Sequence, residues 1–254
     1  MRKRLTPIQI NDIRRLASAG FSLQRISENL LIKKSTLYYH AKNSCHKMTK
    51  LNLNLMADSE KGYIIGLFLG DGSFNRGRKE QRFFVRFALD AKRDRDVALR
   101  LAQIFQKAGK RISFISWKSN TIAKTCSKEL VVYIQSYVEY NQGEKNLLFK
   151  KAWSNEFRFG FLAGIIDSDG HVHKHLGTEI KTVSRNIFDS ILEVLETLEI
   201  SANTKMRNAP NNSFSNKPRF EIYIPSAEMK RHNSRIPSAK VARYLPSVDV
   251  SEKH

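Results

Sequence analysis

The chain contains the segment Gly62-Tyr-Ile-Ile-Gly66-Leu-Phe-Leu-Gly70-Asp71-Gly72 and repeats it in altered form as Gly160-Phe-Leu-Ala-Gly164-Ile-Ile-Asp-Ser168-Asp169-Gly170. In each copy a small residue stands at every fourth position, which places these residues on one face of a helix. A helix face without side chains lets a second helix come very close. The sequence therefore predicts two helices packed against each other through Gly62, Gly66, Gly70, Gly160, Gly164 and Ser168.

Both segments end with an aspartate followed by glycine, a typical signal for the end of a helix. If the two helices pack side by side, Asp71 and Asp169 emerge together at one end. Mg²⁺ prefers oxygen ligands, and the partial negative charge at a helix C-terminus also favours a cation. We therefore expect these two carboxylates, with the adjacent backbone carbonyls of Gly70 and Ser168, to bind Mg²⁺, with Mn²⁺ able to replace it.

The repeated segments resemble the motif of the LAGLIDADG homing endonucleases. The second copy, Leu162–Gly170, departs from the name-giving string only at Ile165 and Ser168. The first copy, Ile64–Gly72, is looser but keeps the glycine, the late acid and the final glycine. Two copies at the spacing of a small domain are similar to the single-chain, two-motif type, and the resemblance covers residues from about 58 to 248.

The resemblance implies a site-specific double-strand DNA endonuclease that hydrolyses phosphodiesters with divalent metal. In this family the late acid of each motif is a metal ligand, which here means Asp71 and Asp169. The earlier acid of the second motif is Asp167, and its counterpart in the first motif is Leu69. Because that position is not an acid in both motifs, we expect Asp167 to have a structural or capping role.

The family also places a lysine near each scissile phosphate, late in each half. Lys145 follows Asp71 by 74 residues and Lys240 follows Asp169 by 71 residues. These similar offsets make Lys145 and Lys240 the candidate catalytic lysines. A basic chain offers alternatives, namely Lys92, Arg93 and Lys181.

Composition agrees with a nucleic-acid partner. The chain has 254 residues, 44 Lys and Arg against 24 Asp and Glu, and a formal net charge of +20. Such a charge points to a polyanion, and the longest apolar stretch, Tyr63 to Leu69, is too short to span a bilayer. Cys45 and Cys126 form no CxxC motif, so neither a disulfide framework nor a zinc knuckle is supported. We expect an intracellular protein, cytoplasmic or organellar, that is not secreted.

The first fifty residues predict a small helix-turn-helix domain. Helical apolar spacing follows Thr6-Pro7, a second helix is expected after Ser22, and a third begins near Ser35. In this motif the third helix enters the major groove, which predicts DNA contacts from Lys34, Ser35, Thr36, Tyr39 and His40. A basic helical bundle with a solvated face is the alternative. Residues 43–57 are expected to be a polar linker.

The remainder predicts two halves, residues 58–150 and 151–254, each with the order α-β-β-α-β-β-α. In the first half, residues 128–140 are expected to form the closing helix, and in the second a short helix is expected near residues 227–231. The fold class is therefore α+β, with two pseudo-symmetric halves forming a saddle of antiparallel strands for DNA. One face of these strands should be polar, with contacts from Ser73, Asn75, Arg82, Arg86, Lys118, His171, His173, His175, Lys181, Lys205 and Arg207.

Three histidines at alternating positions, His171, His173 and His175, also match the spacing of a zinc site on a strand. The equivalent positions in the first half, Ser73, Asn75 and Gly77, bind no metal, so contacts with the DNA groove or phosphates are the preferred interpretation.

The two halves differ in sequence, which favours a monomer acting on a long, asymmetric double-stranded DNA target. Two further functions stay open at this point. One is a non-cleaving transcription regulator of the same fold, although retention of both Asp71 and Asp169 favours the nuclease. The other is an RNA-splicing maturase, a role that some family members have.

Overall fold

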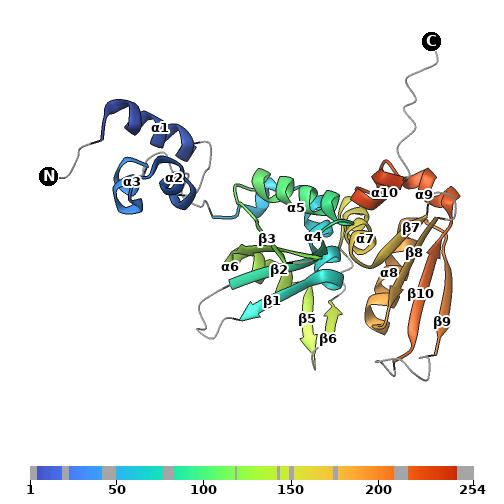
Figure 1. The fold of residues 1–254 in the computed structure, drawn as a ribbon. Helices are drawn as coiled ribbons and strands as arrows, with labels where there is room; N and C mark the ends of the chain where they lie inside the picture. Colours follow the sequence, from blue (N-terminus) through green and yellow to red (C-terminus); the bar gives the residue numbers. More distant parts are fainter. Residues whose placement is uncertain are drawn as a thin grey trace, which may run out of the picture. The chain divides into compact units, whose positions relative to one another are not determined.

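The structure is a computed structural model, and it describes residues 5–18, 23–41, 50–76, 83–117, 119–141, 144–148, 152–173, 177–208 and 217–244. The chain divides into two compact units, residues 1–49 and 50–254 (Figure 1). In the described part of the chain, no helix is long and apolar enough to cross a membrane.

The first unit contains helices α1 (Pro7–Ser18), α2 (Leu23–Leu30) and α3 (Lys34–Ala41). Thr6 begins α1, and its hydroxyl accepts a hydrogen bond from the N–H of Gln9 at 3.3 Å, as an N-cap residue does. The apolar positions of the helices meet in a separate small core formed by Ile13, Ala17, Ile26, Leu37 and Ala41. This core is independent of the larger one.

The second unit begins each half with a motif helix, α4 (Asp58–Asp71) or α7 (Asn155–Asp169). The first half continues with β1 (Gly72–Arg76), β2 (Phe83–Asp90), α5 (Arg95–Lys107), β3 (Ser113–Trp117), β4 (Asn120–Cys126) and α6 (Lys128–Gln135). The second half continues with β7 (Gly170–His173), β8 (Gly177–Thr182), α8 (Arg185–Thr197), β9 (Asn203–Arg207), β10 (Arg219–Ile224) and α9 (Ser226–His232). The predicted α+β class and the repeated element order are confirmed.

The two motif helices lie side by side at the centre of this unit (Figure 1). A Cβ atom on Gly66 would meet the carbonyl oxygen of Phe161, and one on Gly164 would meet that of Tyr63. Gly62 and Gly160 face Phe157 and Ser59 in the same way, and Gly70 faces the side chain of Ser168. The small residues therefore let the two backbones touch directly, as their spacing predicts.

The two sheets have the same topology, with strand orders β1-β2-β4-β3 and β7-β8-β10-β9, and all pairs are antiparallel. Alternate residues of the central strands point into the core, for example Val85 and Phe87 in β2 and Phe220 and Ile222 in β10.

The structure differs from the sequence interpretation in three places. Helix α6 ends at Gln135, and a two-stranded hairpin follows, β5 (Val138–Asn141) with β6 (Glu144–Leu147). A further helix, α10 (Ala239–Tyr244), follows α9. Leu51 and Met56 are buried in the larger core, so residues 50–57 belong to the second unit and the predicted linker is too long; residues 43–49 lie outside the described residues.

Candidate active site and DNA-binding surface

Asp71 and Asp169 are the last residues of the two packed helices, so they lie at the same end of the helix pair. The two carboxylates come near each other because Gly70 has no side chain. A Cβ atom on Gly70 would lie only 2.9 Å from Oδ2 of Asp169. The structure thus brings together the two acids that the sequence singles out.

The pKa of Asp71 is raised to about 7, first by its removal from water and then by the negative charges of Asp169 and Asp94. Loss of water also raises the pKa of Asp169, although part of this residue stays exposed, and the nearby ammonium groups of Lys145 and Lys240 oppose that shift. A pair of desolvated carboxylates with mutual repulsion is an environment in which a cation is favourable.

Lys145 and Lys240 occupy equivalent places in the two halves. The Nζ of Lys145 donates hydrogen bonds to the carbonyls of Phe68, Gly70 and Gly72 at 2.8, 2.9 and 2.8 Å, all at the end of α4. The Nζ of Lys240 is 3.3 Å from the carbonyls of both Ser168 and Gly170, at the end of α7. Each lysine therefore lies at the C-terminus of the motif helix of its own half.

The pKa of Lys145 is lowered to about 8 because the group is largely removed from water, an effect that the charges of Asp169 and Asp71 oppose. The Lys145 ammonium lies at the end of α4, where the backbone carbonyls carry partial negative charge. The alternative candidates are more exposed. The backbone N–H groups of Lys92 and Arg93 bond to Asp90, and both side chains are exposed. Lys181 is an exposed residue of β8 that lines the same cavity as Lys145 and Asp169.

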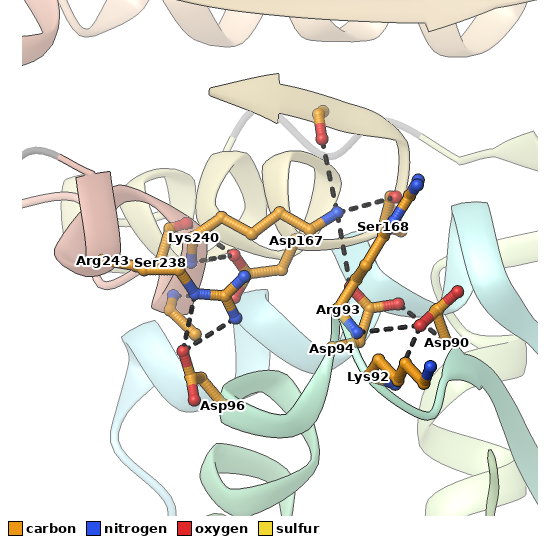
Figure 2. Close-up of polar contacts among 12 residues, drawn as sticks. Asp90, Lys92, Arg93, Asp94, Asp96, Asp167, Ser168, Ser238, Lys240 and Arg243 are labelled. Atoms are coloured by element: carbon orange, nitrogen blue, oxygen red, sulfur yellow. Dashed lines mark hydrogen bonds and ion pairs between the residues drawn. The ribbon is translucent and has the colours of Figure 1, made fainter. Parts of the chain in front are cut away.

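Asp167 is fully buried and holds the segment that carries Lys240 (Figure 2). Its carboxylate accepts hydrogen bonds from the hydroxyls of Tyr63 at 2.8 Å and Ser238 at 2.5 Å. It also accepts the backbone N–H groups of Ala239 at 2.9 Å and Lys240 at 3.0 Å. These two amides open α10, so Asp167 caps that helix and ties both halves to it, in agreement with the expected structural role.

The donor set at the helix ends fits a divalent cation. The carbonyls of Gly70 and Ser168 each accept one lysine ammonium, but a carbonyl oxygen has a second lone pair. Within the described ranges there is no group of three or more His, Cys, Asp or Glu side chains that could hold a metal. A site of two carboxylates completed by carbonyls and water would suit Mg²⁺, which keeps several waters in proteins.

A third acid, Asp94, lies near the helix ends and was not predicted as a site residue from the sequence. It precedes α5 at the N-cap position, and its Oδ1 lies 3.8 Å from the Nζ of Lys240 (Figure 2). Its Oδ2 accepts the backbone N–H of Asp90 at 2.8 Å. An acid before an amphipathic helix is an ordinary capping signal, so the sequence alone gives no reason to place it beside a lysine of the other half.

A cavity of about 370 Å³ opens beside Asp169 and Lys145. Its lining includes Lys181, Lys217 and Arg219, which makes it strongly basic, together with Glu144, which forms an ion pair with Lys217. The sequence interpretation missed Lys217 and Arg219. Clustered Lys and Arg side chains next to paired carboxylates form a suitable place for a phosphate of the nucleic-acid backbone.

The solvent-facing side of the second sheet carries most of the predicted DNA-binding residues of that half. Cross-strand pairing aligns His171 with Glu179, and Lys181 with Glu221 and Lys205. Arg207 and His173 alternate onto the same face. The sequence analysis did not predict Glu179 and Glu221 on this face. They form ion pairs there, Glu179 with Lys181 at 2.7 Å and Glu221 with Arg207 at 2.8 Å.

On the corresponding face of the first sheet, the described residues include fewer charged side chains. Ser73 of β1 pairs across the strands with Arg86, which in turn pairs with Lys124 and through it with Ser113. Lys124 also lies over the ring of Phe84, with its Nζ 3.8 Å from the ring centroid. Asn75 is in β1, but its side chain lies outside the described residues, as do Arg82, Lys118 and His175.

Among the residues that the structure describes, the histidine pair on β7 belongs to no group of three or more side chains that could hold a metal. His171 and His173 have ring centroids 4.1 Å apart, and the pKa of His171 is lowered by desolvation and by His173. In the first unit, the predicted contact residues of α3 are largely on the surface: Lys34, Ser35 and Tyr39 are exposed, and Thr36 and His40 are half-buried. Leu37 fills the core and Tyr38 is exposed.

Comparison with known proteins gives the family context for this geometry. Residues 150–246 match the family model described as homing endonuclease. An uncharacterized protein of Methanocaldococcus jannaschii is 26% identical over 226 residues, covering 84% of this chain and 78% of the relative.

Two similar solved structures are complexes of the homing endonuclease I-DmoI with DNA. The complex with calcium has a TM-score of 0.53 at 11% identity, covering 71% of this chain and 91% of that chain. The complex with manganese has a TM-score of 0.51 at 12% identity, covering 71% and 98%. The comparisons therefore show that the chain has the fold of these homing endonuclease structures and that residues 150–246 match the homing endonuclease family model.

Proposed function

We propose that this chain is a site-specific double-strand DNA endonuclease that acts as a monomer and hydrolyses one phosphodiester in each strand of a long, asymmetric target. The observation that carries the proposal is the reciprocal arrangement at the ends of α4 and α7. Each helix presents an aspartate, and each half adds a lysine to the same place. Similar structures contain DNA together with calcium or manganese, which is consistent with divalent-metal use.

Each residue has a separate part in the proposed reaction. Asp71 and Asp169, with the carbonyls of Gly70 and Ser168, would hold the metal, which we take to be Mg²⁺. When bound, divalent ions supply an activated water and neutralise charge on the leaving oxygen. Lys145 and Lys240 would lie close to the scissile phosphates and stabilise the negative charge that develops on them.

The rest of the chain would position the DNA. The open faces of the two sheets provide basic and hydrogen-bonding side chains, and the basic cavity at Lys145 would take a backbone phosphate. The two sheet faces differ in residue content, so they would read different half-sites, which supports an asymmetric target. We further propose that the first unit is a helix-turn-helix domain, with Lys34, Ser35, Thr36, Tyr39 and His40 of α3 near DNA.

A selection experiment tests this function. A library of randomised duplexes is incubated with the protein and Mg²⁺, and the cleaved ends are sequenced. We expect a single long recognition sequence without twofold symmetry. Asp71→Asn and Asp169→Asn should lose cleavage but retain binding to the selected duplex, because the acids hold metal rather than bases.

Asp189→Asn is the matched control, since Asp189 is an exposed acid paired with Arg185 on α8. This variant should cut like the parent. Specific binding by the wild-type chain without any cleavage would overturn the nuclease proposal and point to a DNA-binding regulator of the same fold. Loss of binding equal to the loss of cutting in both aspartate variants would contradict the role given to the two acids.

A further inference from the structure

The two halves contact each other reciprocally at the candidate active site. Helix α10 of the second half, which carries Lys240, packs against α5 of the first half. Strand β6 of the first half, which carries Lys145, packs against α8 of the second half, where the N–H of Leu147 donates to Asn186 at 2.6 Å. Lys240 therefore lies beside the N-terminal end of α5, and Lys145 lines the same cavity as the N-terminal end of α8.

The residues at those two helix starts differ in charge. Asp94 is the N-cap of α5, and Ser184 is the N-cap of α8. Asp94 lies 3.8 Å from Lys240, and the two side chains are only 12% and 15% exposed. Ser184 lines the same cavity as Lys145, and its hydroxyl accepts the N–H of Ile187 at 3.4 Å. One lysine thus has a desolvated anion beside it, and the other has a neutral hydroxyl nearby.

This difference changes the field that each lysine offers to a phosphate. A carboxylate within ion-pair distance cancels much of the positive potential of an ammonium, and poor solvation makes the effect stronger than in water. The same carboxylate also repels an incoming phosphate. The negative charge of Asp94 reaches Asp71 as well and contributes to its raised pKa.

We propose that Asp94 is a positioning residue that makes the two half-sites unequal: its ion pair with Lys240 slows cleavage of the strand that Lys240 serves relative to the strand that Lys145 serves. The inference rests on the proposed nuclease function. It assigns to Asp94, through its contact with the lysine of the other half, control over the order in which the two strands are cut.

The experiment follows each strand of the selected target separately, with a different label at each end. Lys145→Met and Lys240→Met first identify the strand that each lysine serves, by which strand slows. Asp94→Asn then removes the charge but keeps an oxygen that can accept the N–H of Asp90, so the loop before α5 is retained. We expect the strand assigned to Lys240 to be cut about tenfold faster, the change that about 1.4 kcal/mol of transition-state stabilisation produces.

Two further variants test the charge itself. Asp94→Glu, which keeps the charge, should preserve the wild-type ratio of strand rates. Ser184→Asp, which introduces an acid near Lys145, should slow the other strand. A variant that combines Asp94→Asn with Ser184→Asp should reverse the order of cutting.

The matched control is Asp96→Asn. Asp96 lies in the first turn of α5, in the same contact between α5 and α10, but its partner is Arg243, 2.7 Å away, rather than Lys240 (Figure 2). Asp96→Asn changes the net charge by the same amount as Asp94→Asn but leaves the ion pair between Asp94 and Lys240 in place. It should therefore leave the ratio of strand cleavage rates unchanged. In metal-free binding measurements, Asp94→Asn should bind the target more tightly than Asp96→Asn at equal net charge.

The outcomes separate the inference from the function on which it rests. A strand ratio that stays the same in Asp94→Asn, or changes equally in Asp96→Asn, overturns the inference while the nuclease proposal stands. A wild-type chain that cuts neither strand overturns the nuclease proposal and the inference together.

Discussion

The buried carboxylate of Asp167 accepts the backbone N–H of Lys240 at 3.0 Å. The acid lies within the second motif helix and the lysine follows it by 73 residues. Through this bond, one turn of the motif helix fixes the start of α10 and so the place from which the Lys240 side chain reaches Ser168 and Gly170. The second motif thus supplies one acid at the helix end and another that positions the lysine.

Asp167→Asn should therefore reduce both stability and cleavage of one strand. The carboxylate accepts from two hydroxyls and two backbone amides, whereas an asparagine has one accepting oxygen and an NH₂ that faces the remaining donors. We expect a loss of about 2–4 kcal/mol in the free energy of unfolding, because a buried backbone N–H is left without a partner. Urea denaturation measures the loss.

Tyr63→Phe provides the comparison for that variant. It removes a single donor to Asp167 and leaves the α10 amides bonded, so about 1 kcal/mol of stability should be lost and the ratio of strand cleavage rates kept. If Asp167→Asn unfolds at the same urea concentration as the parent, the network does not hold the helix start in the way described.

Gly164→Ala should destabilise the protein, although alanine is the better helix former by about 1 kcal/mol at an ordinary helix position. The added Cβ would meet the carbonyl oxygen of Tyr63 and the backbone nitrogen of Leu67. Both are backbone atoms of the opposing helix, so the helices must separate, at a cost of about 1–3 kcal/mol or more. Thermal melting measures the net change.

Glu196→Ala is the control, because Glu196 is exposed on α8 and its replacement should change stability by no more than about 0.5 kcal/mol. An unchanged or raised melting temperature for Gly164→Ala would show that the backbones do not need this close contact.

Because the pKa of Asp71 is raised, we expect an unusual dependence of stability on pH in the absence of divalent metal. Its pKa is near 3.8 when unperturbed and about 7 in the folded chain, so between these values the folded state holds a proton that the unfolded state has released. The stability that Asp71 contributes is then full below about pH 4 and is lost as the pH rises to about 7. Asp71→Asn cannot titrate, so above pH 7 it should be more stable than the parent by about 2 kcal/mol, after allowance for solvent screening.

Added metal should reverse that order. Ca²⁺ or Mg²⁺ binds the ionised carboxylates and should raise the melting temperature of the parent at pH 8, while Asp71→Asn should show little increase. Calorimetric melting at pH 5 and pH 8, with metal and with chelator, checks both parts. A parent chain that is stabilised no more by metal than the variant is would contradict Asp71 as a ligand.

The local periodicity of small residues allows the central helix pair, α4 and α7, to be predicted from the sequence. Small residues at every fourth position specify a close helix pair whatever surrounds them, and the two ends of that pair place Asp71 and Asp169 together. The similar offsets of Lys145 and Lys240 from these acids, 74 and 71 residues, reflect an internal repeat, which is also visible without a structure.

The missed features depend on contacts between the halves or on short elements. The segment from Lys128 to Tyr140 contains no glycine or proline to mark the end of α6 at Gln135, so the sequence predicts helix as far as Tyr140, where the structure has strand β5. Helix α10 is only 6 residues long, too short to produce a clear apolar period. Asp94 acquires its neighbour Lys240 only when the two halves pack, and no local pattern records that.

Deletion of residues 1–49 should leave a folded protein with a footprint that is shortened at one end only. The described residues of the second unit form their own core, from Leu51 to Val241, so the remaining chain should melt cooperatively and retain cleavage. If α3 contacts bases, its removal should lower affinity and relax specificity at the flanking base pairs, by about 1–3 kcal/mol for each lost base contact. Nuclease protection of the selected target by the parent and the deletion variant measures the change.

A triple substitution of Lys34, Ser35 and Tyr39 by alanine, all exposed on α3, should reproduce the shorter footprint without removing the unit. An unchanged footprint would leave the first unit as a folding or protein-binding element, and contraction at both ends would mean that the protein binds as a dimer.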